Sequence, residues 1–491
     1  MNVLIDTNIL IPLEDTGREL DPRMAEMRRL SQQNGHVLYI HSSQKEDIAR
    51  DPDERRREIV SSRLRQYQEI PSPPKLTDAE LEEYGWTQKN ENDRIDNLLL
   101  HAVCRGAVHF LITNDKKIHA NARKAKIQEH VHYLDQFVAY LRTQTTEEEP
   151  PPPGIQEIFL HEIEVRQPFF DSLRRNYDGY DTWYQDKARE RRKAWCVREN
   201  GTVDAICIYK LEESPEITDS GLKLNGSALK LCTFKVGEGV RGRKLGERLL
   251  HCAFKYAVEK NTAYVYLHIF GEQHEMLVSL CEDYGFQAVG KYNNRDEAYL
   301  KEMSPPESLN CRYDPLTYAV KYYPNYLDSP AVAKFIVPIL PQYHEKLFPD
   351  ISSFATGLFS DDPSQYTSES NTIKKAYICH SNITRIRSGD LLLFYRTKDK
   401  KSVECVGVVE QTYRGKDINR VLPMVSKRTV YSRKEIEQWL QKETLIILFR
   451  FLQNFSPVSR EILSQAEIRG PIQAIRKISH EQYVRCFKRD E

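Results

Sequence analysis

Two aspartates in the first 115 residues each stand at the carboxyl end of a predicted buried strand. Asp6 ends the strand that is predicted within the run from Asn2 to Leu10, and Asp115 follows the run from Val108 to Thr113. Open α/β sheets place their functional sites at the carboxyl ends of their strands. We therefore expect both carboxylates at one edge of a parallel sheet.

Two acidic pairs lie near the starts of predicted helices. Glu46 and Asp47 open a helix after a predicted strand over residues 37–40, and Asp93 and Asp96 share one face of a helical pattern over residues 91–104. Carboxylates gathered at one edge would repel one another and favour protonation unless a cation bound them. Mg²⁺ and Mn²⁺ prefer oxygen ligands and activate water for in-line attack on a phosphodiester. The alternative is that these acids only cap helices and strand ends.

The motifs Leu4-Ile5-Asp6-Thr7-Asn8 and Thr113-Asn114-Asp115, in this order, resemble those of the PIN domain family over about 140 residues. The resemblance implies an α/β/α sandwich around a parallel sheet, binding of Mg²⁺ or Mn²⁺, and hydrolysis of RNA such as tRNA. It maps the catalytic and metal-binding acids to Asp6, Asp47, Asp96 and Asp115, with Glu46 as an alternative to Asp47 and Asp93 as an auxiliary metal ligand. A catalytically inactive PIN domain stays an alternative.

A glycine-rich turn from Gly237 to Gly246 lies between a predicted strand, residues 228–236, and an amphipathic helix. The unpaired amides and positive dipole end of such a helix start suit a pyrophosphate. A second strand from Ala263 to Ile269, a helix over about residues 272–283, and Tyr284-Gly285-Phe286 follow.

This order of elements resembles the GNAT acyltransferase family over residues 155–303, which implies an α+β fold and acetyl-CoA as cofactor. The loop departs from the family pattern because Lys244 stands where a glycine is expected. By this resemblance either Cys281 or Tyr284 would protonate the leaving thiolate. The alternative is a CoA-binding or purely structural module. The expected cofactor-binding residues are Val240, Arg241, Gly242, Arg243, Lys244, Gly246 and His274.

Residues 371–491 carry 24 basic and 13 acidic residues, although the whole chain is neutral with 71 of each. Such a surplus attracts polyanions. The turn Ser388-Gly389-Asp390 and the strands predicted over residues 391–396 and 405–410 resemble the PUA-like superfamily, which includes ASCH and EVE domains. The resemblance implies a small β-barrel that reads RNA; the alternative is a protein-interaction barrel. We expect Phe394 inside the barrel. The expected RNA contacts are Lys374, Lys375, Tyr377, Arg385, Arg387, Tyr395 and Arg396, with the tyrosines as outward stacking platforms.

The domain boundaries follow from composition. A Glu/Pro stretch over residues 146–154 cannot continue a helix or join a sheet interior. We therefore predict a multidomain α/β protein with a PIN-like domain over 1–145, a GNAT-like domain over 155–303 and a PUA-like domain over 310–491. No apolar run reaches the roughly 20 residues of a membrane helix. The ten cysteines form no zinc-ligand pattern, so we expect reduced thiols in a cytoplasmic protein.

The predicted function is that of a metal-dependent ribonuclease coupled to an acetyl-CoA-binding domain and an RNA-binding module. Since PIN and GNAT modules recur among bacterial toxins, a toxin or anti-phage effector fits the combination by analogy. A homo-oligomer or an antitoxin would then be a partner. One alternative is an N-acetyltransferase acting on RNA, aminoacyl-tRNA or protein beside a non-catalytic PIN domain. Another is a non-catalytic RNA-binding scaffold.

Overall fold

The computed structural model describes the chain except residues 16–20, 146–153, 200, 238–239, 241–243, 271–274, 306–312, 349–371, 426–427, 432 and 489–491. The chain divides into two compact units. Unit 1 contains Met1–Pro150 and Asp417–Ser426, and unit 2 contains Pro151–Lys416 and Lys427–Glu491.

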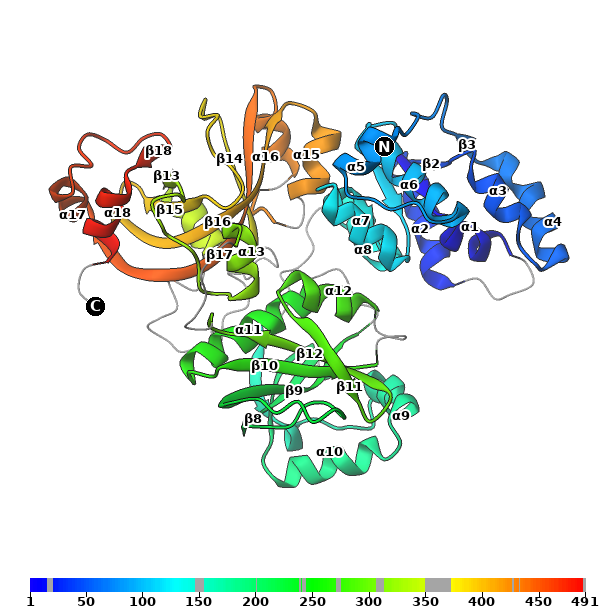
Figure 1. Cartoon of the computed structure of the whole chain (residues 1–491), viewed down its shortest axis with the longest axis horizontal. Coiled ribbons are helices and arrows are strands. Elements are labelled where there is room, and N and C mark those ends of the chain that lie inside the picture. Colours follow the sequence, from blue (N-terminus) through cyan, green and yellow to red (C-terminus); the bar gives the residue numbers. More distant parts are fainter. Residues whose placement is uncertain are drawn as a thin grey trace. The chain divides into compact units, whose positions relative to one another are not determined.

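Unit 1 is built on a five-stranded parallel sheet in the order β3-β2-β1-β4-β5, drawn in blue and cyan in Figure 1. Its strands are β1 (Asn2–Ile5), β2 (Val37–Ile40), β3 (Gln68–Glu69), β4 (Phe110–Ile112) and β5 (Val131–His132). The sequence run that follows β1 forms a helix instead of a longer strand, because Asp6 accepts the amide of Thr7 and thereby caps α1.

Helices cover both faces of this sheet. They are α1 (Thr7–Glu14), α2 (Pro22–Gln33), α3 (Gln44–Ala49), α4 (Glu54–Arg63), α5 (Asp78–Glu83), α6 (Glu91–Cys104), α7 (Lys116–Lys124) and α8 (Leu134–Thr145), with single turns η1 (Leu64–Gln66) and η2 (Gln128–His130). Successive β1 side chains alternate between two cores. Val3 and Ile5 pack with α2 and α8, whereas Leu4 packs with α6 and α7.

One helix of unit 1 comes from far along the sequence. Helix α15 (Ile418–Val425) packs against η2, and two of its own side chains, Val421 and Val425, are completely buried. Nothing in the sequence pattern predicted this placement.

Unit 2 contains two sheets. The first has the order β11-β12-β10-β9-β8-β7-β6, and its neighbouring strands are antiparallel except for the parallel pair β9 and β10. The strands are β6 (Gln156–Phe159), β7 (Lys193–Glu199), β8 (Thr202–Glu213), β9 (Ser227–Val236), β10 (Tyr264–Ile269), β11 (Gln287–Tyr292) and β12 (Asp296–Glu302). The predicted order of strand, turn, helix, strand and helix is present.

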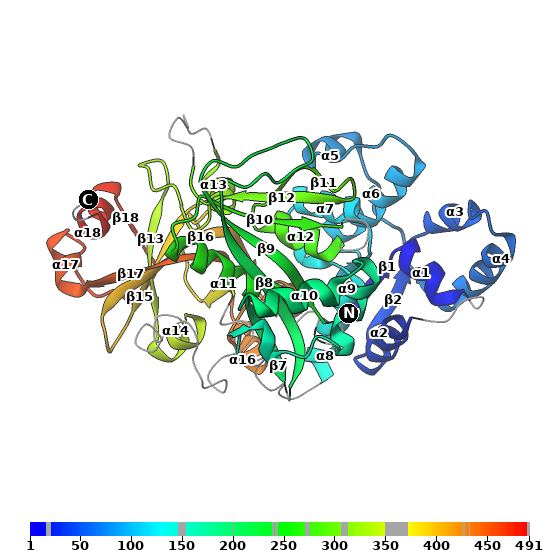
Figure 2. The ribbon, with the colours of Figure 1, turned by 90° about the horizontal axis from the view of Figure 1, so that it is seen from below.

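Helices again lie on both faces of this first sheet. They are α9 (Asp171–Asn176), α10 (Tyr180–Arg189), α11 (Leu245–Glu259) and α12 (Glu275–Asp283), with turns η3 (Leu160–Glu162) and η4 (Pro168–Phe170). The side chains of α11 and α12 pack on one face, and those of α9 and α10 pack on the other. In Figure 2, α9 and α10 lie in front of β8 and β9.

The second sheet of unit 2 has six strands in the order β14-β17-β16-β15-β13-β18. They are β13 (Lys334–Ile339), β14 (Lys374–Cys379), β15 (Leu391–Arg396), β16 (Ser402–Gly415), β17 (Thr444–Ser459) and β18 (Arg476–Ile478). The accompanying helices are α13 (Pro315–Lys321), α14 (Pro341–Leu347), α16 (Arg433–Trp439), α17 (Arg460–Gln465) and α18 (His480–Phe487). Over the described residues β14 and β18 do not pair, so the predicted closed barrel is replaced by an open sheet.

The two sheets of unit 2 share one hydrophobic core. Leu249 of α11, Tyr323 and Leu393 of β15 belong to the same buried cluster. Both sheets therefore lie in unit 2, which takes in residues 151–416 and 427–491. The division of this part of the chain into domains over 155–303 and 310–491 stays a prediction. None of the described helices is both long and apolar enough to span a membrane.

Candidate functional site

Asp6 joins the two sequence motifs of unit 1. Its Oδ1 accepts a hydrogen bond from the Thr7 amide at 2.6 Å, and its Oδ2 accepts bonds from Asn8 Nδ2 at 2.7 Å and Thr113 Oγ1 at 2.6 Å. Thr113 directly follows β4, the neighbour of β1. The two strand ends therefore meet at one sheet edge, as predicted.

The other three acids lie on elements near this edge. Asp115 caps α7 by accepting the amides of Lys117 at 2.7 Å and Ile118 at 3.1 Å. Asp47 lies in α3, where Arg50 donates to it at 3.0 Å, and Asp96 lies in α6. Each predicted catalytic acid thus belongs to a different helix or helix cap.

The four carboxylates act on one another electrostatically. Burial, opposed by hydrogen bonds and reinforced by Asp115 and Asp47, raises the pKa of Asp6 to about 6. Burial, followed by the charges of Asp6 and Asp115, raises the pKa of Asp96 to about 7, with Asp47 contributing in the same direction. These effects are those expected of acids that share one site.

Electrostatic coupling between carboxylates is not enough for a metal site, because the ligand atoms must also lie close to one another. Among the described residues, no group of three or more His, Cys, Asp and Glu side chains has the spacing needed to hold a metal ion. The predicted convergence of the four carboxylates on one ion therefore stays a prediction. Asp47 and Asp115 each have partners within the protein, in Arg50 and the α7 amides.

The two auxiliary acids have structural partners. Asp93, predicted as an extra metal ligand, is buried, forms an ion pair with Lys117 and accepts the Lys89 amide at 2.8 Å. The hydrogen bond from Lys117 is the main reason why the pKa of Asp93 lies below its usual value. Glu46 pairs with Arg94. Asp93 thus links α6 to α7, and this ion pair occupies the carboxylate that we had assigned to a metal.

The raised pKa values predict that unit 1 loses stability as the pH rises. Asp6 and Asp96 bind their protons more tightly in the folded protein than in the unfolded chain. Their contribution to the free energy of unfolding is therefore fully present below about pH 4, and it is lost as the pH rises through about 6 and 7. We expect the free energy of local opening at α6 to fall by about 2 kcal/mol from pH 5 to pH 8. Hydrogen exchange of the α6 amides, corrected for intrinsic rates, measures this. An Asp96→Asn variant should show a smaller fall, and an equal fall would contradict the assignment.

In unit 2, the parallel strands β9 and β10 part at their carboxyl ends. They pair only from Ala228 to Leu231 and from Tyr264 to Leu267, although β9 continues to Val236 and β10 to Ile269. The β10-facing backbone of the last five β9 residues therefore has no partner in β10. Such an edge offers hydrogen-bonding groups to a ligand.

The predicted pyrophosphate turn is described in part. Val240, Lys244 and Gly246 are described, whereas Arg241, Gly242, Arg243 and His274 lie outside the described residues. A Cβ on Gly246 would stand 2.9 Å from Leu280 Cδ2 of α12, so the Leu280 side chain would have to shift to admit a larger residue there. Lys244, at the N-cap of α11, has a φ of 56°, which is the left-handed conformation that glycine adopts without strain.

The conformation of Lys244 predicts the order of stability of two variants. Lys244→Gly and Lys244→Ala both remove the ammonium, which lies 3.6 Å from the Glu247 carboxylate. Only alanine keeps the steric cost of the left-handed conformation, about 1 kcal/mol. We expect the alanine variant to be less stable than the glycine variant by this amount in urea denaturation. Equal stability would show that the position does not hold this conformation.

The two candidate proton donors of the acyl transfer are buried. Cys281 is 0% exposed and Tyr284 is 2% exposed, and both belong to the core shared by the two sheets. Burial, followed by the charge of Glu247, raises the pKa of Tyr284 far above its usual value. The Lys374 amide donates to Glu247 Oε1 at 2.9 Å, and Arg450 donates to the Asp283 carbonyl at 2.8 Å. The second sheet therefore packs against these elements, and neither donor is accessible to solvent.

Of the two aromatic platforms predicted for RNA, Tyr395 is buried and Tyr377 is half-buried against a hydrophobic cluster. Phe394 and Tyr395 point to opposite faces of β15, as expected, but Tyr395 is only 5% exposed because its face packs on the shared core. The Tyr377 hydroxyl donates to the Pro338 carbonyl at 2.6 Å. The Tyr395 ring is therefore not exposed for stacking on a base, whereas stacking by Tyr377 stays a prediction.

Three of the five predicted cationic contacts are occupied within the protein. Lys374 pairs with Asp283 at 3.2 Å, Lys375 lies over the rings of Phe348 and Phe451, and Arg396 pairs with Glu345 and Asp399. Arg385 and Arg387 are exposed. Sequence spacing alone could not show that Lys374 and Lys375 have partners within the protein, because Asp283, Phe348 and Phe451 come from distant segments. The partner Asp399 of Arg396, by contrast, lies three residues away.

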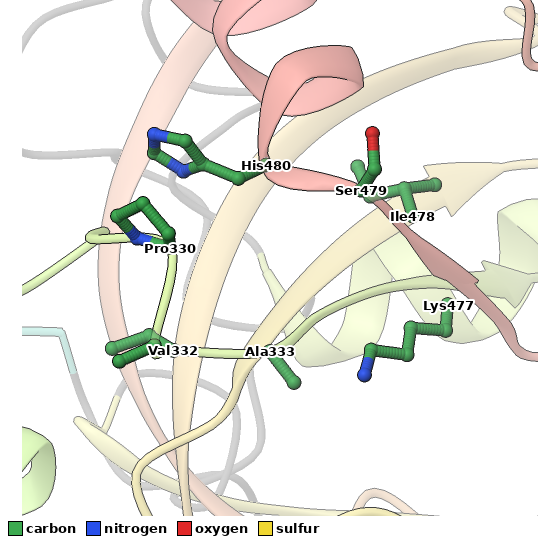
Figure 3. A pocket seen from close by; sticks show the side chains of 8 residues that line it. Pro330, Val332, Ala333, Lys477, Ile478, Ser479 and His480 are labelled. Carbon is green, nitrogen blue, oxygen red and sulfur yellow. The ribbon is translucent and has the colours of Figure 1, made fainter.

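A surface pocket of unit 2 contains none of the predicted site residues. It lies between the start of β13 and the start of α18 (Figure 3). His480 Nδ1 lies 3.2 Å from Lys334 Nζ, which also donates to the Val332 carbonyl at 2.8 Å. These contacts tie α18 to β13. The lining residues are Pro330, Ala331, Val332, Ala333, Lys477, Ile478, Ser479 and His480.

Comparisons with known proteins give only distant likenesses. No family model matches the chain, and no curated protein does. Among solved structures, the chain is similar to ASCH from Zymomonas mobilis at 14% identity and a TM-score of 0.24, over 31% of this chain and 92% of that one. It is similar to Arabidopsis thaliana NAA60 in complex with acetyl-CoA at 18% identity and a TM-score of 0.24, over 30% and 95%. A GNAT acetyltransferase from Staphylococcus aureus Mu50 matches at 17% identity and a TM-score of 0.24, over 30% and 99%.

Proposed function

We propose that unit 1 is a metal-dependent endoribonuclease. The observation that carries the proposal is the hydrogen bond from Thr113 to Asp6, which joins the ends of β1 and β4 at the carboxyl edge of a parallel sheet. There burial, with added repulsion from Asp115 and Asp47, raises the pKa of both Asp6 and Asp96. Acids whose protons are held this tightly are suited to exchange them for a hard cation. Asp6, Asp47, Asp96 and Asp115 would hold Mg²⁺ or Mn²⁺, which when bound supplies an activated water and neutralises charge on the phosphodiester.

The protein's own contribution is to fix and orient these carboxylates. Thr113 and Asn8 hold Asp6 from two sides, and the α7 amides hold Asp115. The exposed Arg385 and Arg387, in the basic C-terminal segment, are proposed to attract RNA. Cleavage of a single-stranded RNA by the full chain, with Mn²⁺ or with chelator, tests the proposal. Equal cleavage under both conditions would contradict it.

A second function is proposed for unit 2: transfer of an acetyl group from acetyl-CoA. The supporting observation is the parting of β9 and β10 beside the start of α11. The pyrophosphate would lie over residues 240–246, where the helix amides and dipole favour an anion. Calorimetric titration of the full chain with acetyl-CoA tests this. Absence of binding at millimolar ligand would contradict it.

A further inference from the structure

The surface pocket between β13 and α18 combines apolar walls with two polar side chains. Its volume is about 480 Å³, a size suited to a small molecule. None of its lining residues is acidic. Figure 3 shows Lys477 and His480 on opposite sides of the pocket, with the aliphatic residues Val332 and Ala333 below them. Both lining segments lie inside fully described parts of the chain, residues 313–348 and 433–488.

Behind the pocket lies Lys334, a buried lysine without a close counter-ion. The residue is 1% exposed, and among the described residues no carboxylate lies within ion-pair distance of its ammonium group. The charges of Asp328 and Asp390 act on it from farther away, and Asp328 pairs with Lys488 at 3.0 Å. Buried charges are normally paired, because an uncompensated charge costs free energy of folding. An anion in the pocket would supply this compensation.

The contacts of Lys334 determine which nitrogen of His480 carries its proton. The ammonium group donates to the Ser329 carbonyl at 2.5 Å, to the Val332 carbonyl at 2.8 Å and to His480 Nδ1 at 3.2 Å. Because an ammonium group is a donor only, Nδ1 must accept. The neutral imidazole therefore carries its proton on Nε2, from which it can donate to a ligand. The bond at Nδ1 also polarises the ring, which makes Nε2–H a stronger donor.

We propose that this pocket binds a phosphate monoester, with the phosphate group between Lys477 and His480. Lys477 would contribute a positive charge and His480 Nε2 a hydrogen-bond donor. The charges of Lys477 and Lys334 together match the dianion of a phosphate monoester better than the single charge of a carboxylate. The dipole of α18, which begins at His480, favours an anion at the same place.

The aliphatic lining would contact the organic part of the ligand. Polar groups that fix one end of a molecule beside an apolar wall are typical of small-molecule sites. The inference is independent of both proposed functions, because none of the lining residues belongs to either proposed site.

Calorimetric titration of the full chain tests the inference, with a chelator present to prevent metal-dependent cleavage of RNA. The probes are inorganic phosphate, adenosine 5′-monophosphate, and a short RNA that carries either a 5′-phosphate or a 5′-hydroxyl group. We expect adenosine 5′-monophosphate to bind more tightly than inorganic phosphate, because its nucleoside can contact the aliphatic wall. Absence of binding by every phosphate-bearing probe at millimolar concentration would overturn the inference.

The two RNAs distinguish the sources of the phosphate group. Tighter binding of the 5′-phosphorylated RNA than of both the 5′-hydroxyl RNA and the mononucleotide would support the inference and identify the end of an RNA as the ligand. Equal affinity for the two RNAs, with binding of the mononucleotide, would support it and identify a small phosphate monoester.

Variants at the pocket locate the bound phosphate. Lys477→Gln and His480→Phe should each weaken binding of adenosine 5′-monophosphate about tenfold, in line with the loss of one charge-assisted hydrogen bond. Lys477→Arg keeps the charge and should stay within a few-fold of wild type. Lys477 is exposed, so its change tests the site without disturbing the core. His480→Phe also removes a partner of Lys334, and its melting temperature is therefore measured beside its affinity.

Arg485→Gln is the matched control. Arg485 lies in the last turn of the same helix, its side chain is 59% exposed, and it stands 3.9 Å from Glu467. Its loss removes the same charge at the far end of α18, so binding should not change. Equal weakening by Lys477→Gln and Arg485→Gln would reduce the effect to general charge and overturn the inference. Wild-type affinity in the Lys477→Gln variant would place the phosphate elsewhere and overturn it as well.

Discussion

Replacing Asp96 by asparagine is expected to lower metal-dependent RNA cleavage by about 10²- to 10³-fold, which corresponds to the several kcal/mol that a bound cation contributes to the transition state. The amide keeps the shape of the side chain but removes its charge. Because the Asp96 carboxylate already holds its proton up to about pH 7, the same change should raise the stability of unit 1 at pH 8. Cleavage is measured with Mn²⁺ on a single-stranded RNA.

Asp93→Asn is the control within the same helix. Asp93 is ion-paired with Lys117 and bonded to the Lys89 amide, so its change should lower stability and leave metal-dependent cleavage within a few-fold of wild type. Asp96→Asn should therefore lower cleavage and raise stability at pH 8, whereas Asp93→Asn should lower stability and leave cleavage nearly unchanged. Wild-type cleavage by Asp96→Asn would show that this carboxylate takes no part in catalysis.

Replacing Glu410 by glutamine is expected to destabilise unit 2 by about 3–5 kcal/mol. Glu410 of β16 accepts hydrogen bonds from Arg428 and, at 2.6 Å, from Arg450. Both guanidinium groups are almost fully buried, with side chains 4% and 7% exposed. Loss of the carboxylate leaves two buried positive charges without their shared partner. Urea denaturation of the variant measures the effect.

The surface pair of Arg433 and Glu437 provides the comparison. Its side chains are about half exposed, so Glu437→Gln should change the free energy of unfolding by less than about 1 kcal/mol. A loss of that small size in Glu410→Gln would mean that solvent reaches the buried arginines.

Local patterns predicted much of the secondary structure. The helix over residues 91–104 and the strand over residues 391–396 were predicted with the bounds that the structure gives to α6 and β15. The run from Asn2 to Leu10 was harder, since a continuous apolar run fits both a strand and a buried helix. The structure uses it for both, with Asp6 as the boundary.

Burial by distant segments could not be predicted from the sequence. The alternation of Phe394 and Tyr395 correctly placed them on opposite faces, but it carries no information about what covers each face. The same applies to Asp93, whose partner Lys117 lies 24 residues away, and to the core that joins the two sheets of unit 2.

The position of α15 in the sequence determines when unit 1 can complete its packing during synthesis. The chain passes between its two units after Pro150, after Lys416 and after Ser426. Helix α15, in which Val421 and Val425 are fully buried, becomes available to η2 only when the ribosome has made the intervening residues 151–416. A nascent chain that ends before Asp417 therefore has every strand of the unit 1 sheet but not its last helix. Packing of unit 1 is therefore completed only after residues 151–416 of unit 2 have been synthesised.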